Sequence, residues 1–117
     1  MSTAREATWE RNALDNLEIT TAHKMPNTNA PSSVVDIYKD DKLYQRRYYG
    51  VTGKPRLDID FTDGGQPKYH PLVPHAHPWT TRKLENGDVK NERGHPYRPL
   101  TLAERIVNID ENPKTSR

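Results

Sequence analysis

Alternating apolar and polar positions are the main feature of the middle of the chain. Three stretches there combine this alternation with β-branched and aromatic residues, and turn-forming residues separate them. The stretches are residues 34–39 (VVDIYK), 43–49 (LYQRRYY) and 56–61 (RLDIDF). They predict three strands of an antiparallel β-meander, which is about the smallest sheet that is stable by itself.

The third predicted strand has two chemically different faces. Its apolar residues point to one side, and Asp58 and Asp60 point to the other. We expect Arg46, on the second strand, to share the face of the two aspartates. We also expect the Arg46–Arg47 pair to lie on a solvated strand surface rather than to clamp a nucleic acid.

Helical patterns flank the meander. Residues 1–24 predict an N-terminal helix or arm, because Thr3 and Glu6 fit a capping box and apolar residues follow at roughly helical spacing. Those apolar residues are Trp9, Ala13, Leu14 and Leu17. Residues 101–109 predict a second short helix, where Thr101 and Glu104 fit another capping box.

The remaining segments complete the expected organisation. Residues 25–33 read as a linker, and residues 80–93 as a polar hairpin with its turn at Asn86 and Gly87. Residues 34–110 are therefore expected to form one domain, followed by a disordered tail over 111–117. The predicted class is α+β: a small antiparallel meander, a Pro/His-rich loop and two peripheral short helices.

Composition narrows the range of proteins to consider. Hydrophobic residues make up 32% and charged residues 29% of the 117 residues, and the formal net charge is only +2. The chain has no cysteine, which excludes disulfides and thiolate metal ligands. No apolar run has membrane-spanning length and the N-terminus lacks an apolar signal core, so we expect a cytoplasmic protein without a membrane partner.

Residues 62–79 concentrate histidine and proline. His70, His75 and His77 lie among four prolines, and His95 also precedes a proline. A residue before proline is restricted to extended conformations, and histidine exchanges protons near neutral pH. In an extended segment, His75 and His77 point the same way. The pattern predicts a functional site in this loop.

One interpretation of the site is metal-independent cleavage of RNA, which requires an acid, a base and a cation for the developing charge. His75 and His77 are the candidate acid and base, and His70 is the next candidate. The expected substrate contacts are Lys68, Arg82, His95 and Trp79, and the expected supporting carboxylates are Asp58, Asp60 and Asp63. This mechanism needs no cofactor.

Two other interpretations stay open. His70, His75, His77 and Asp60 have the chemistry of a zinc site, which would also stabilise a small core. Alternatively, the histidines brace the loop by hydrogen bonds to backbone carbonyls, while Asp58 and Asp60 pair with arginines of the neighbouring strand.

The segments VVDIYKDDKLYQRRYYG and LDIDFTDGGQPKYHPLVPHAHPW carry a family resemblance. Their pattern resembles D-I-D-[YF]-T-D-H-G-N-P followed by K-x-H-P-x-x-P-H-x-H-x-W, over roughly residues 26–100. The pattern is typical of a small module at the C-terminal ends of bacterial polymorphic toxins and in phage minor head (head-morphogenesis) proteins. Matching positions include Asp58, Asp60, His70, His75 and His77.

The resemblance implies a nuclease-like module of phage or toxin origin, since such terminal modules are generally taken to be RNases. It also implies RNA or a protein partner, namely an immunity, capsid or host protein. The chain departs from the pattern at Gly64, where the family has histidine, and at Gln66, where it has asparagine. If the missing histidine is the catalytic one, a non-enzymatic phage-associated interaction module is the better expectation.

Overall fold

The β-branched and aromatic runs of the chain form a mixed sheet. The computed structural model describes residues 8–62, 74–94 and 97–110. These residues contain seven strands in the order β1-β2-β3-β4-β5-β6, with β7 also paired to β5. The strands are β1 (Leu17–Thr20), β2 (Val34–Lys39), β3 (Lys42–Tyr49), β4 (Pro55–Asp60), β5 (His75–Lys83), β6 (Val89–Arg93) and β7 (Arg98–Pro99).

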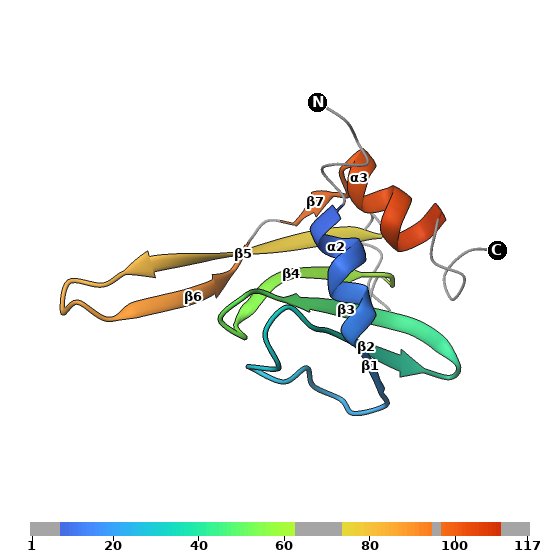
Figure 1. Ribbon diagram of the computed structural model, residues 1–117, viewed down its shortest axis with the longest axis horizontal. Coiled ribbons are helices and arrows are strands. Elements are labelled where there is room, and N and C mark those ends of the chain that lie inside the picture. Colours follow the sequence, from blue (N-terminus) through green and yellow to red (C-terminus); the bar gives the residue numbers. More distant parts are fainter. Residues whose placement is uncertain (1–7, 63–73, 95–96, 111–117) are drawn as a thin grey trace.

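The helices are short and lie at the two ends of the described chain. They are α2 (Thr8–Ala13), which continues into a 3-10 turn η1 (Leu14–Asn16), and α3 (Leu102–Arg105), which continues into a π-helical turn η2 (Ile106–Asp110). Both members of the capping box predicted at Thr101 and Glu104 are present at the start of α3. The molecule is thus a small α+β domain with a sheet and two short helices (Figure 1).

The N-terminal prediction was partly wrong. Helix α2 ends at Ala13, and residues 17–20 form strand β1 instead of continuing a helix. β1 runs parallel to β2, from the pair Leu17–Val34 to the pair Thr20–Ile37, while the other strand pairs are antiparallel. The backbone hydrogen bonds of the β2 edge outweigh the weak helical pattern of this segment. The predicted Thr3–Glu6 capping box lies outside the described residues.

The two faces of the sheet are covered differently. On one face the helices bury Val34, Tyr48, Leu57 and Ile59, and side chains of α2, η1 and η2 pack against them. On the other face the buried apolar residues are Met25, Val35, Ile37 and Tyr49. The rest of that second face, over β3, β4 and β5, is polar and contains the candidate site.

Arg46 lies on the helix-covered face, opposite to the prediction, because it pairs in register with Ile59 rather than with an aspartate. It is fully buried, and its guanidinium contacts both carboxylate oxygens of Asp36 at 2.7 and 2.8 Å. Burial opposes its charge, but the hydrogen bonds to Asp36 raise the pKa of Arg46 above its ordinary value. Arg46 also donates to Asn108 of η2, which ties this helix to the sheet.

Glu10 of α2 makes the stability of the fold depend on pH. Glu10 is 3% exposed, and burial raises its pKa from 4.5 to about 7. Between these values the folded state holds a proton that the unfolded state has lost, so stability falls as pH rises through this window. We expect about 3 kcal/mol less stability at pH 8 than at pH 4.5 from this group alone.

Urea unfolding of the wild type and of Glu10→Gln at several pH values measures this contribution. The glutamine keeps the shape of the side chain and cannot ionise, so Glu10→Gln should lose this component of the pH dependence. Glu85→Gln, at an exposed glutamate, is the matched control. Equal pH profiles for the wild type and Glu10→Gln would show that the buried carboxyl is not the responsible group.

Candidate functional site

Strand β5 presents two histidines on one face of the sheet. The segment from His75 onward was predicted as a loop, and the structure corrects this to a strand that pairs with β4. His75 pairs with Asp60 and His77 with Asp58, so these four side chains come together on one face. The prediction that His75 and His77 point the same way is confirmed. Residues 63–73 and 95–96 lie outside the described residues, including the predicted site residues Asp63, Lys68, His70 and His95.

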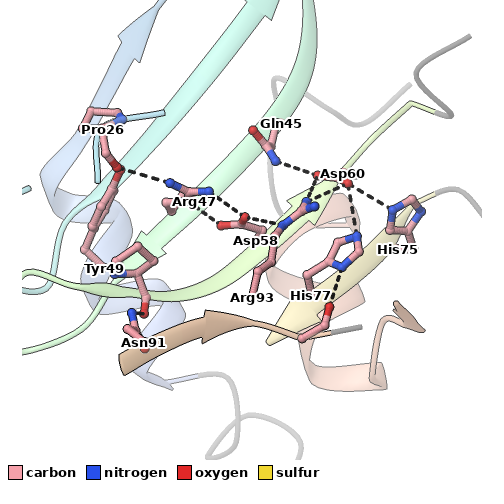
Figure 2. Close-up of polar contacts among 12 residues, drawn as sticks. Pro26, Gln45, Arg47, Tyr49, Asp58, Asp60, His75, His77, Asn91 and Arg93 are labelled. Atoms are coloured by element: carbon pink, nitrogen blue, oxygen red, sulfur yellow. Dashed lines mark hydrogen bonds and ion pairs between the residues drawn. The ribbon is translucent and has the colours of Figure 1, made fainter. Parts of the chain in front are cut away.

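Asp60, His75 and His77 form a compact group, called here the histidine cluster. The Oδ2 atom of Asp60 lies 3.0 Å from Nε2 of His75 and 3.4 Å from Nε2 of His77. The histidines are 1% and 2% exposed, whereas the Asp60 side chain is 20% exposed. Figure 2 shows the two imidazoles directed at the same carboxylate from β5. Three potential metal-ligand atoms thus lie within 4.8 Å of one another.

The hydrogen bond of His77 Nδ1 determines whether His77 Nε2 carries a proton in the neutral ring. His77 Nδ1 lies 2.8 Å from the carbonyl oxygen of Gly94, and because a carbonyl only accepts, Nδ1 carries the proton. In the neutral ring, Nε2 then presents a lone pair to the Asp60 carboxylate. A lone pair on Nε2 and a carboxylate oxygen repel each other, whereas a proton or a metal ion between them attracts both.

Glycine at position 94 allows the contact between His77 Nδ1 and the carbonyl oxygen of residue 94. The backbone N–H of Gly94 donates to the carbonyl oxygen of Pro78 at 2.6 Å. A Cβ atom at Gly94 would lie 2.6 Å from that same oxygen, which is too close for any other residue in this position. The close approach of the two backbones therefore places the Gly94 carbonyl next to the His77 ring.

The Asp60 carboxylate is held from two further directions. Gln45 donates to its Oδ1 at 2.9 Å, and Nη2 of Arg93 lies 3.2 and 3.0 Å from its two oxygens. Burial opposes ionisation, but the contact with His77 and the charge of Arg93 prevail and hold the pKa of Asp60 below its usual range. The carboxylate is therefore ionised and ready to bind a cation.

Asp58 has a different role from Asp60. It is fully buried and accepts two hydrogen bonds from Arg47, at 2.7 and 2.9 Å, and one from Arg93 at 2.9 Å (Figure 2). Arg93 thus bridges Asp58 and Asp60. The expected pairing of Asp58 with an arginine of β3 is confirmed, but Arg47 is buried rather than solvated.

Aromatic rings surround the cluster. The Tyr97 ring lies 4.2 Å from that of His75, at an interplanar angle of 31°. The guanidinium of Arg47 lies 5.0 Å from the centre of the Trp79 ring, which is two residues beyond His77 on β5. These contacts position both the histidine ring and the arginine beside the cluster.

Arg82, a predicted phosphate contact, lies outside this cluster. It belongs to the hairpin of β5 and β6, where its exposed side chain contacts Glu92 at 2.6 Å. Sequence reasoning missed Gln45, Gly94 and Arg93 as members of the site. The predicted hairpin turn offered a signal for Arg93, because closing it in register places this residue opposite Trp79.

Comparison of the chain with protein-family models, with curated proteins and with solved structures finds no match. The resemblance to toxin and phage modules therefore stays a prediction. Over the part of the chain that the structure describes, no helix combines the length and apolar composition needed to cross a bilayer.

Proposed function

We propose that Asp60, His75 and His77 bind a divalent transition-metal ion, with zinc as the first candidate, and that the domain is a nuclease-like module acting on RNA. The observation that carries the proposal is the convergence of two imidazole Nε2 atoms and one carboxylate oxygen. Zinc bonds of about 2.0–2.1 Å place neighbouring tetrahedral ligands about 3.3 Å apart. The separations of 3.0 and 3.4 Å from Asp60 Oδ2 match this value, and all three ligand atoms lie within 4.8 Å of one another.

The surroundings of the cluster also suit a metal centre. Metal-binding histidines commonly donate their other N–H to a backbone carbonyl, as His77 does to Gly94. Ligating carboxylates are commonly hydrogen-bonded in turn, as Asp60 is by Gln45 and Arg93. Two histidines and one carboxylate are a frequent ligand set of catalytic zinc, which keeps one position for water.

A metal centre explains the geometry better than the metal-independent mechanism does. An acid and a base must reach different atoms of the substrate. Here both Nε2 atoms face the same oxygen of Asp60, and Nδ1 of His77 is engaged with Gly94. The two Nε2 atoms therefore share one partner instead of facing two separate positions.

Local charge favours an anionic substrate once the metal is bound. The positive charges of Arg47 and Arg93 balance the negative charges of Asp58 and Asp60. A divalent ion therefore gives this region a net positive charge, which suits the phosphodiester of a nucleic acid. The ion would supply Lewis acidity and a bound water of lowered pKa. Arg93, with 28% of its side chain exposed, is placed to contact a phosphate beside the ligands.

Several parts of the proposal come from the sequence alone. His70 is a further candidate ligand, and Lys68 and His95 are candidate substrate contacts in the Pro/His-rich segment. The resemblance suggests a phage or toxin origin and an immunity, capsid or host protein as partner.

Incubation of the protein with tRNA and rRNA tests this function. The protein is stripped with EDTA, reloaded with zinc, nickel or manganese, and the RNA is resolved on a denaturing gel. We expect discrete fragments only with the reloaded protein, and about a hundredfold slower cleavage by His77→Ala, because loss of a ligand removes the metal. His23→Ala, at an exposed histidine elsewhere, should cleave like the wild type.

The other outcomes separate the alternatives. Cleavage that persists in EDTA and depends on His75 and His77 would replace the metal centre with the acid–base mechanism. Metal binding without any cleavage would remove the nuclease part of the proposal and favour a protein-interaction module.

A further inference from the structure

A groove opens where the hairpin of β5 and β6 separates from the rest of the sheet. Strand β4 pairs with β5 only as far as Leu57 and Pro78, whereas β5 continues with β6 to Lys83. Figure 1 shows this hairpin extending well beyond β4. The groove has a volume of about 560 Å³ and lies between the turn that precedes β4 and the first half of the hairpin.

The walls of the groove combine positive charge, an aromatic ring and neutral hydrogen-bonding groups. The polar and aromatic residues are Thr52, Lys54, Arg56, Trp79, Thr80, Thr81 and Asn91. None of the described residues that line it is acidic. Lys54 and Arg56 are exposed, and the Arg56 guanidinium also lies 3.7 Å from the centre of the Trp9 ring of α2.

The groove adjoins the histidine cluster through strand β5. Trp79 lies two residues beyond His77 on the same face, about 7 Å along a strand. Arg47 contacts both the Trp79 ring and Asp58, and Arg93 joins Asp58 to Asp60. A ligand in the groove is therefore adjacent to the groups that hold the cluster.

We infer that this groove binds a single-stranded part of the RNA substrate. The bound nucleotides would lie next to the phosphodiester bond that is cleaved at the histidine cluster. Lys54 and Arg56 contact phosphates, and Trp79 provides the surface on which a base stacks. Basic side chains that follow the backbone, combined with aromatic stacking, are the general way in which proteins bind single strands. This inference rests on the proposed function for its substrate, but the binding itself requires no metal.

Binding of a fluorescein-labelled 2′-O-methyl oligoribonucleotide, measured by anisotropy in EDTA, tests the groove without cleavage. We expect Lys54→Ala and Arg56→Gln each to reduce the slope of log affinity against log salt by about 0.7, the value for one phosphate contact. We expect Trp79→Ala to weaken binding about tenfold and Trp79→Phe to retain most of it. Lys42→Ala, at the exposed first residue of β3, is the matched control and should bind like the wild type.

Thermal melts of each variant separate binding from folding. Lys54 and Arg56 are exposed, so their variants test the inference even if Trp79→Ala fails to fold. Wild-type affinity and salt slope in both basic variants would overturn it. Displacement of the oligonucleotide by an acidic peptide of equal charge at equal concentration would overturn it as well, because the groove would then bind extended peptides. Zinc binding measured on the same variants shows whether the cluster itself is intact.

Discussion

Excess zinc is expected to raise the melting temperature of the protein by about 10 °C. A ligand that binds only the folded state adds about 2.7 kcal/mol of stability at a concentration one hundred times its Kd, and a domain of this size melts several degrees higher for each kcal/mol. His75→Ala, His77→Ala and Asp60→Asn should each remove most of this rise, because each deletes one of three protein ligands.

The measurement is the difference between melts with zinc and with EDTA for each variant. This difference matters more than the absolute melting temperature, because His77→Ala also loses its hydrogen bond to Gly94. His23→Ala should keep the full zinc response. Cobalt offers an independent readout, since visible absorption of the Co²⁺ protein reports the ligand set. If zinc, nickel and cobalt all leave the melting temperature of the wild type unchanged, the cluster is better explained as an ion pair between Asp60 and an imidazolium.

The local elements of this fold could be predicted because their signals are local. β2 has the predicted bounds, β6 is the second strand of the hairpin predicted over residues 80–93, and β3 and β4 differ from the predictions by about one residue. The capping box at Thr101 and Glu104 starts the predicted helix. Alternation alone placed His75 and His77 on one side. Each of these features depends on a few neighbouring residues.

The missed features depend on contacts between distant parts of the chain. β1 forms because β2 offers a parallel partner, and no local pattern encodes that pairing. β5 begins at His75 because this segment pairs with β4, although its sequence predicted a loop. Gly94 and Arg93 reach the site only through the register of the hairpin with β5.

The buried arginines escaped prediction for a related reason. Arginine in an alternating strand suggests solvent exposure, since charged residues are seldom buried without partners. Arg46 is buried because Asp36 lies opposite it on β2 and Asn108 reaches it from η2. The sequence contains these partners but does not indicate that they meet.

Asp36→Ala is expected to destabilise the protein by about 3–5 kcal/mol, which is a large part of the stability of a typical domain. Asp36 and Arg46 are both fully buried, and the carboxylate accepts two hydrogen bonds from the guanidinium. Removing the carboxylate leaves the arginine charge in the interior, where Asn108 still accepts a hydrogen bond from it. Urea unfolding measures the loss, and Asp15→Ala, at an exposed aspartate, should change stability by less than about 0.5 kcal/mol.

A double variant shows whether the loss comes from the stranded charge or from the pairing itself. Asp36→Val combined with Arg46→Met replaces both charges with apolar side chains of similar size, and Tyr48 still donates to Asn108. The attraction within a buried ion pair exceeds the cost of desolvating its two charges by little. This variant should therefore be more stable than Asp36→Ala alone. Equal destabilisation in the two variants would contradict this account, since removing the stranded charge would then recover no stability.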